Sequence, residues 1–517
     1  MSVEQSLSVL RERNAVARLH DRDATLWSDE SDARAVVDNR LGWLDSVPAT
    51  DDFLARLAEV KACLPGYNRV VLAGMGGSSL APEVFSKIFA SETAGGPRLA
   101  LLDSTHPDAV AAVLDDTDLS RTVVVVASKS GSTEETACFA SRAAALLPAE
   151  RLVAITDPGS QLEQEATEAG WAAVVTNPPD IGGRYSALSF FGGVPAHLIG
   201  VPVTSVWSLA AEMLERCRAD VDDNPGAQLA AFMAGNTLVG RDKLTLLAPS
   251  ELAPLGDWIE QLVAESTSKQ GRGIVPVVGE PVEDPQVYGD DRAFVALRLG
   301  ADAAMGVHEL EAAGFPVFVL DVADHRHLGA EFVRWEVATA LAGVLLGVNP
   351  FDEPNVSESK ANTVAALKEV TDGAPLPSPE QGDVAALLSK VSPGDYVSIQ
   401  AYLNPTPEHV DALLRMRVFI RDIRHVATTV GWGPRFLHST GQLHKGGADN
   451  VVVLQVVDAP QGGPDIPDRP YDFATLVRAQ ALGDLRSLRD HGRRVVQVGV
   501  EDGDIEAVVA AVEAALR

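Results

Sequence analysis

The sequence predicts an α/β protein with two doubly wound parallel-sheet domains and a C-terminal α/β extension. Short apolar runs rich in β-branched residues alternate with helical stretches along the chain. Many of these runs end in a glycine or serine turn. Continuous apolar strands that alternate with helices are typical of parallel sheets covered on both faces. The 517 residues are enough for two or three domains, each with its own core.

The predicted strands fall into two groups. Those of the first half are 69–73, 99–103, 123–127, 152–156 and 172–176. The pattern restarts after a polar stretch, with runs at 244–248, 294–298 and 317–321. We therefore expect an N-terminal helical segment over residues 1–44, a first α/β domain over 45–215 and a second over 216–372.

The remaining region, 373–517, is expected to be the C-terminal extension. Two stretches rich in proline and glycine, 372–379 and 458–464, are expected to be surface loops. Beyond the second loop, the pattern predicts a helix over 473–491, a strand over 494–500 and a closing helix over 504–517.

Composition excludes several classes of protein. The chain has 42 basic and 72 acidic residues, a net charge of −30, which repels phosphate backbones and excludes nucleic acid as a partner. Cys63, Cys138 and Cys217 lie far apart, which excludes a disulfide scaffold and favours a reducing compartment. The apolar run 337–348 is too short to span a bilayer, and the N-terminus lacks a signal-peptide core. We expect a cytoplasmic protein without a membrane partner.

Two loops of the first predicted domain have the composition of phosphate sites. The run Gly74-Met-Gly-Gly-Ser-Ser follows a strand and is expected to open a helix at Ser78 or Ser79. Glycines such as Gly77 let the backbone approach an anion, and a helix N-terminus supplies free N–H groups. The alternative is a tight turn that binds nothing.

The second loop, Ser128-Lys-Ser-Gly-Ser-Thr-Glu-Glu-Thr, is more specific. Ser128, Lys129, Ser130 and Thr133 offer donors that match the acceptor oxygens of a phosphomonoester. The alternative is a cluster of N-capping hydroxyls with no ligand. Two such loops after neighbouring strands favour a site at the carboxyl edge of the sheet. Neither loop has the spacing of a nucleotide triphosphatase, so we expect the phosphate of a small metabolite.

Several motifs in sequence order carry a family resemblance. The second loop resembles the sugar-phosphate loop of sugar isomerase domains. The segments 182–186, 258–269 and 347–356 extend the likeness to the phosphoglucose isomerase family, from about residue 40 to the C-terminus. The runs 439–447 and 479–484 look closest to the isomerase half of bacterial transaldolase–isomerase fusions. That half is expected to stand alone here.

The resemblance implies two sugar isomerase domains and an aldose–ketose isomerase of glucose 6-phosphate and fructose 6-phosphate, working through a cis-enediolate. It implies no cofactor and a homodimer. Glu265 matches the family's catalytic base, and moving a proton between adjacent carbons requires such a group. Arg184 matches the arginine expected to stabilise the enediolate charge. Lys445 matches the lysine that helps to open the cyclic sugar.

One position departs from the family pattern. Arg292 occurs where the family carries a histidine that assists ring opening. Arginine stays charged at neutral pH and is a poor proton shuttle. Ring opening then depends on another group, for which His444 and His438 are candidates, or on Arg292 acting through its charge alone.

Three alternatives remain at this point. His325 and His327 next to Asp324 could chelate a metal, but no further ligand has a recognised spacing, so we expect a polar turn before a helix over 331–346 and no metal site. The substrate could instead be mannose 6-phosphate as well as glucose 6-phosphate, or another hexose phosphate. A non-catalytic phosphosugar sensor or partner subunit is the third possibility. The presence of Glu265, Arg184 and Lys445 argues against it, and the missing histidine argues mildly for it.

Overall fold

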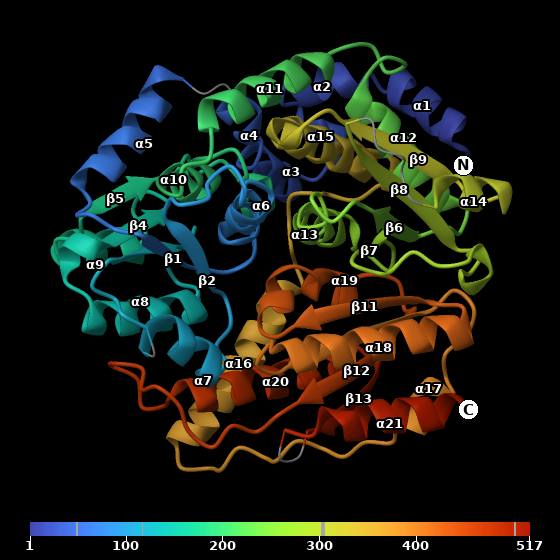
Figure 1. Ribbon diagram of the computed structural model, residues 1–517. Coiled ribbons are helices and arrows are strands. Elements are labelled where there is room, and N and C mark those ends of the chain that lie inside the picture. Colours follow the sequence, from blue (N-terminus) through green and yellow to red (C-terminus); the bar gives the residue numbers. More distant parts are fainter. Residues whose placement is uncertain (48–49, 116, 301–305, 501–502) are drawn as a thin grey trace.

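The computed structural model describes residues 1–47, 50–115, 117–300, 306–500 and 503–517, and its described strands form three parallel sheets (Figure 1). The α/β prediction is confirmed. The region expected to be an extension has a four-stranded sheet of its own.

The first sheet has the strand order β2-β1-β3-β4-β5. Its strands are β1 (Arg69–Gly74), β2 (Arg98–Leu102), β3 (Thr122–Ala127), β4 (Leu152–Thr156) and β5 (Ala173–Thr176), close to the predicted ranges. Alternate residues of β1 face opposite sides, so Val70 and Leu72 join one core and Val71 and Ala73 another. The helices that supply these cores are α5 (Asp51–Cys63), α6 (Leu80–Ile88) and α10 (Phe190–Leu198) for the first, and α8 (Glu134–Leu146) and α9 (Gln161–Glu168) for the second.

The second sheet has the order β7-β6-β8-β9. Its strands are β6 (Lys243–Leu247), β7 (Val275–Val277), β8 (Arg292–Leu299) and β9 (Val317–Val322). Its helices are α11 (Val203–Arg216), α12 (Pro225–Leu238), α13 (Leu255–Thr267), α14 (Val307–Ala312) and α15 (Leu328–Leu346). Every residue of α15 is buried, which explains the apolar run in this helix.

The N-terminal helices are α1 (Val3–Glu12), α2 (Ala15–His20), α3 (Ser31–Asp38) and α4 (Trp43–Ser46). Of these, α1 packs on α12 and α15, and α2 on α15. One continuous core therefore joins the N-terminal helices, one face of the first sheet and the second sheet.

The third sheet has the order β11-β10-β12-β13. Its strands are β10 (Tyr396–Tyr402), β11 (Ala427–Trp432), β12 (Val451–Val457) and β13 (Arg494–Gly499). Its helices are α16 (Val356–Thr371), α17 (Val384–Leu388), α18 (Pro407–Arg424), α19 (Gly441–Gly446), α20 (Phe473–Asp490) and α21 (Ile505–Leu516). Numbered from its own first strand, each sheet begins with the order 2-1-3-4, so the C-terminal region repeats the topology of the other two.

Short helices connect these elements and line the junctions between sheets. They are η1 (Ala24–Leu26), η2 (Gly76–Ser78), α7 (Pro107–Val110), η3 (Ala111–Asp115), η4 (Ala149–Arg151), η5 (Gly183–Tyr185), η6 (Pro285–Val287), η7 (His325–His327) and η8 (Arg435–His438). The η2, η5 and η8 helices matter most, because they meet beside α13 and define the candidate site.

Candidate active site

A cavity of about 490 Å³ lies at the carboxyl edge of the first sheet, where the sequence predicts a ligand site. It is bounded by η2, the loop after β3, η5, α13 and η8. Eight of the predicted site residues line it: Gly77, Ser78, Ser128, Lys129, Ser130, Thr133, Arg184 and Glu265. The chain therefore brings both phosphate loops, the proposed base and the proposed arginine to one cavity.

The second phosphate loop is held together by its own side chains. Thr133 is the N-cap residue of α8, and the hydroxyl of Ser128 lies 3.4 Å from that of Thr133. Lys129 Nζ donates to Asp157 Oδ2 at 2.5 Å and to the Pro179 carbonyl at 2.8 Å. Burial raises the pKa of Asp157, although Lys129 opposes that shift. The loop therefore presents hydroxyls beside a helix N-terminus, with its lysine braced by a carboxylate.

Gly77 is needed for the contact between η2 and η5. A Cβ atom at this position would lie 2.0 Å from the carbonyl oxygen of Gly183. The sequence predicts that this glycine admits an anion; the structure adds that it lets η2 approach the helix that carries Arg184.

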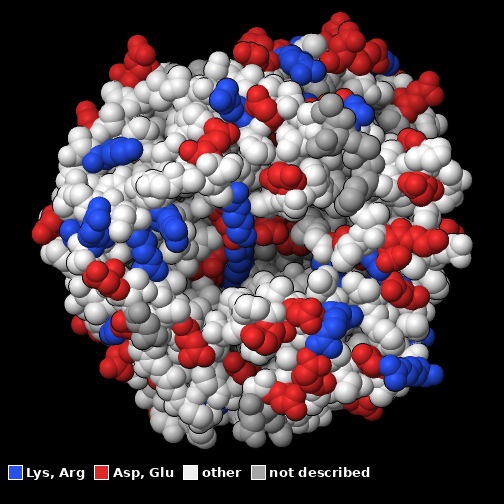
Figure 2. Space-filling view, viewed as in Figure 1, with Lys and Arg blue, Asp and Glu red and all other residues white. Residues whose placement is uncertain are grey.

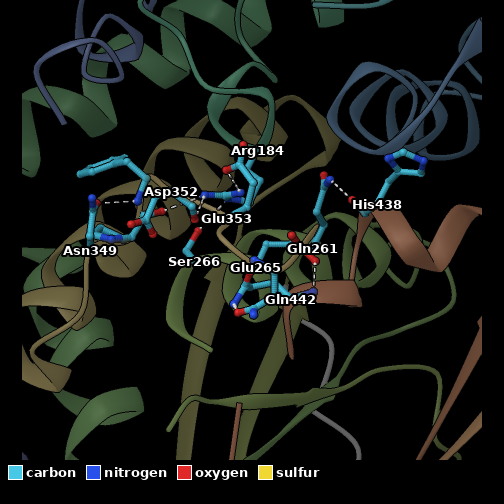
Figure 3. A network of polar contacts seen from close by, with 12 residues as sticks. Arg184, Gln261, Glu265, Ser266, Asn349, Asp352, Glu353, His438 and Gln442 are labelled. Carbon is cyan, nitrogen blue, oxygen red and sulfur yellow. Dashed lines mark hydrogen bonds and ion pairs between the residues drawn. The ribbon is translucent and has the colours of Figure 1, made fainter. Parts of the chain in front are cut away.

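Glu265 lies on the buried face of α13 and is only 3% exposed. Its Oε1 accepts a hydrogen bond from the backbone N–H of Gln442 at 3.0 Å (Figure 3). Burial raises the pKa of Glu265, and Glu353 raises it further, whereas Arg184 and the Gln442 N–H oppose the shift. A desolvated carboxylate held by one hydrogen bond is suited to accept a proton.

Arg184 is fixed from several sides. Its Nε donates to Ser266 Oγ at 3.2 Å, and its Nη1 pairs with Glu353 Oε2 at 2.8 Å. Its Nη2 donates to backbone carbonyls in the segment 350–352, each at 3.1 Å. Although burial opposes it, the charges of Glu353 and Glu265 raise the pKa of Arg184. The cavity therefore has a stationary positive charge near the proposed base.

His438 is the candidate ring-opening histidine that lines the cavity. Its Nε2 lies 3.1 Å from Oε1 of Glu135, at the first turn of α8. Its carbonyl oxygen accepts from Gln261 Nε2 at 2.5 Å. Although burial opposes it, the charge of His438 lowers the pKa of Glu135. A histidine oriented by a carboxylate is an arrangement typical of proton transfer.

His444 lies elsewhere. It is 3% exposed, and its ring lies between Ser398 Oγ at 3.3 Å and Gln400 Nε2 at 3.1 Å, against β10. Burial and the charge of Lys445 lower the pKa of His444 to about 3. The ring therefore stays neutral near pH 7, and His444 is not among the residues that line the cavity, so its catalytic role stays a prediction.

Arg292 and Lys445 are also outside the cavity lining. Arg292, at the amino end of β8, is fully buried and pairs with Glu280 at 3.0 Å; a role for its charge in ring opening stays a prediction. Lys445 is 3% exposed and its Nζ pairs with Asp484 at 2.8 Å. The segment around Lys445 forms α19 rather than the expected loop, because its residues pack against α13 and η8.

Several residues that line the cavity are not among the site residues predicted from the sequence. Glu353 lies in the segment 347–356 that carried part of the resemblance, so a signal for it was present. Arg40 and Lys360 also line the cavity, but they come from the N-terminal segment and from α16, and no local motif marks them.

Within the described ranges, no group of three or more His, Cys, Asp or Glu side chains is placed to hold a metal ion. His325 and His327 lie in η7, and His327 Nδ1 is 3.1 Å from Asp324 Oδ1. Over the same residues, no helix has both the length and the apolar character needed to cross a membrane.

Three parallel sheets, with a hydroxyl-rich loop and a buried carboxylate lining one cavity, define an α/β protein with a candidate site at the carboxyl edge of its first sheet. Solved structures agree on the fold. One is a hypothetical protein from Thermus thermophilus, with TM-score 0.59, 23% identity and coverage of 70% of this chain and 97% of that one. Another is a glucose-6-phosphate isomerase from Chlamydia trachomatis, with TM-score 0.53, 19% identity and coverage of 72% and 87%.

Sequence comparison is more specific. The sequence profile described as "Phosphoglucose isomerase" matches residues 58–224. A glucose-6-phosphate isomerase of Rubrobacter xylanophilus is 29% identical over 62% of this chain and 88% of the relative. One of Cyanothece is 36% identical over 40% of each chain. The chain is therefore similar in sequence to proteins of the phosphoglucose isomerase family.

Proposed function

We propose that this protein interconverts glucose 6-phosphate and fructose 6-phosphate through a cis-enediolate. The observation that carries the proposal is the buried carboxylate of Glu265, which shares one cavity with Arg184 and the phosphate loops. The name and matched length of the family relatives support the same substrate pair.

The proton transfer follows from this geometry. With the phosphate held by the loop hydroxyls and N–H groups, Glu265 takes the proton from C2 of the open-chain aldose. The electron pair moves into the C1–C2 bond, and negative charge develops on the sugar oxygens. The fixed guanidinium of Arg184 stabilises that charge, because its contacts hold it in place before the reaction. Glu265 then returns the proton to C1, which gives the ketose.

Ring opening requires a proton on the ring oxygen and removal of the proton from the C1 hydroxyl. We assign this step to His438, which the carboxylate of Glu135 orients at the cavity wall. Lys445 remains a predicted participant; it is not among the lining residues, and its Nζ pairs with Asp484.

The assembly and location of the protein are part of the same proposal. We propose a homodimer because the family resemblance implies one. We propose a cytoplasmic location, since all three cysteines are free thiols, as a reducing compartment requires. Mass measurement in solution by light scattering tests the first proposal, and a single-chain mass at micromolar concentration would contradict it.

A coupled assay of the purified protein tests the function. Formation of glucose 6-phosphate from fructose 6-phosphate, followed through a dehydrogenase, is the expected result. Absence of turnover in a preparation that binds a phosphosugar acid would contradict the proposal and would favour a sensor. Mannose 6-phosphate, offered in parallel, reveals whether the enzyme also accepts the C2 epimer.

A further inference from the structure

A second cavity, of about 360 Å³, is lined by α13 as well, through Asp257 and Glu260, whereas Gln261 and Glu265 of this helix line the candidate active site. This cavity opens between α6, α13 and β11. Figure 2 shows Asp and Glu residues inside the hollow at the centre of the view. The carboxylates that line it are Glu83, Asp103, Asp257 and Glu260. Arg435 stands among them, with its side chain 20% exposed.

Arg435 joins three parts of the chain that are distant in sequence. Its Nη1 pairs with Asp103 Oδ2 at 3.0 Å, beyond the end of β2. Its Nη2 contacts a carboxylate oxygen of Glu83 on α6 and lies 3.5 Å from Asp257 Oδ2 on α13. One guanidinium from the C-terminal region, which holds the third sheet, therefore contacts the regions of both other sheets at once.

The same elements form the candidate active site. Helix α6 follows η2, which lines the catalytic cavity, and α13 carries Glu265. The η8 helix carries Arg435 at its first residue and His438 at its last, so its two ends face the two cavities. A 3₁₀ helix of one turn has little stability of its own, so its anchors set its position.

We propose that Arg435 is a positioning residue that holds His438 against Glu135 by clamping η8 to α6, β2 and α13. The inference rests on the proposed function, because it gives the His438–Glu135 pair a part in ring opening. Buried ion pairs contribute little net stability but are costly to break one-sidedly, so their retention fits a role in placing groups. Four carboxylates line this cavity. An arginine suits it, because one planar guanidinium can contact several carboxylates at once.

The test compares Arg435→Met and Arg435→Lys with the matched control Arg469→Met. Arg469 also links the third domain to the first, through Glu134 at 2.9 Å, but makes no contact with η8 in the described structure. For each variant, turnover from cyclic glucose 6-phosphate is divided by the rate of proton exchange from an open-chain phosphosugar analogue. We expect this ratio to fall at least about tenfold in Arg435→Met, about threefold in Arg435→Lys, and to stay within twofold of the parent in Arg469→Met.

A double-mutant cycle with His438→Ala separates positioning from a general loss of folding. If Arg435 acts through His438, adding Arg435→Met to His438→Ala lowers the ratio no further. Independent, multiplying effects would overturn the inference, as would equal ratios for the Arg435→Met and Arg469→Met proteins. Arg435→Lys, which keeps the charge, decides the matter if Arg435→Met does not fold.

A second measurement does not depend on activity. The ring ¹⁵N chemical shifts of His438, assigned by their loss in His438→Gln, report its hydrogen bond to Glu135. They are expected to move in both Arg435 variants and not in Arg469→Met; unchanged shifts would overturn the positioning role. An inactive parent protein would contradict the proposed function, and these shifts would still test the clamp.

Discussion

The backbone N–H of Gln442 lies 3.0 Å from Oε1 of Glu265, so α19, in the C-terminal region, directly orients the proposed base on α13. The side chain of Gln442 strengthens the same junction, since it donates to the Ser268 carbonyl at 2.9 Å and to Asn355 Oδ1 at 2.8 Å. The candidate site therefore depends on contacts among the regions that hold all three sheets.

Glu353 is expected to set the acid limb of the pH profile. Its negative charge raises the pKa of Glu265, so Glu353→Gln lowers that pKa and keeps the base ionised at lower pH. We expect the acid limb of kcat/KM to move down by roughly half a pH unit. Steady-state rates between pH 5 and 8 measure it. Glu358→Gln, on α16 but outside the cavity lining, is the control; an unmoved or raised limb in Glu353→Gln would contradict the assignment.

His438 is expected to act in catalysis, whereas His444 is expected to stabilise the fold. His438→Ala should lower turnover from the cyclic sugar about 100-fold, while proton exchange from an open-chain analogue changes little. His444→Ala removes a buried ring that packs against Tyr396 and Phe436, so it should cost about 2–3 kcal/mol of stability. Urea unfolding and the two rate assays on both variants check this. A catalytic loss in folded His444→Ala that matched the loss in His438→Ala would contradict it.

Gly77 and Gly183 form a matched pair for the contact between η2 and η5. Gly77→Ala puts a Cβ against the Gly183 carbonyl, whereas a Cβ at Gly183 meets nothing within 4 Å. We expect Gly77→Ala to lose about 2–4 kcal/mol of stability and most activity, because η5 carries Arg184. Gly183→Ala should lose under about 1 kcal/mol. Thermal unfolding of both variants measures these losses of stability, and equal losses would refute the close-contact explanation.

Glu260 is expected to make the protein less stable as pH rises. Burial and the neighbouring Asp257 raise the pKa of Glu260 from 4.5 to about 8. Between these values the folded protein holds a proton that the unfolded chain has released, so the free energy of unfolding falls with increasing pH. Glu260→Gln removes this loss. The variant should be more stable than the parent by about 1–2 kcal/mol at pH 8, discounted for partial exposure, and equally stable near pH 4.5.

Urea titrations of parent and Glu260→Gln at the two pH values measure this difference. A constant difference between the proteins at both pH values would show that Glu260 does not titrate in this range. The choice of glutamine keeps the shape of the side chain, so packing around Arg435 is disturbed little.

Local patterns predicted the five strands of the first sheet and three of the four strands of the second, but not the short strand β7 (Val275–Val277). The strands of the first domain are continuous apolar runs, such as β3, and every residue of β3 is buried. In β10, Ser398 and Gln400 interrupt the pattern, and they are buried because they bind His444. Their partner lies more than 40 residues away, so the local sequence does not show what these two buried polar side chains bind.

The candidate site shows the same difference between residues grouped by a local sequence motif and residues brought together by tertiary contacts. Motif residues on one sheet edge, such as Ser128 and Thr133, were predicted together because parallel strands end at the same edge. The choice between His438 and His444 depends on which face of the segment 435–446 packs on α13. That is set by tertiary contacts, including the pairing of His438 with Glu135.

Deuterium incorporation during isomerisation, measured for the parent and Glu265→Gln proteins, tests the central claim most directly. Fructose 6-phosphate is incubated in deuterium oxide, and label at C1 of the ketose and C2 of the aldose is followed by NMR. Because one carboxylate serves both carbons, we expect the parent to label both positions and Glu265→Gln to lose at least about 1,000-fold in each rate, with nearly unchanged binding of a phosphosugar acid. Near-normal labelling by Glu265→Gln at either carbon would contradict the mechanism.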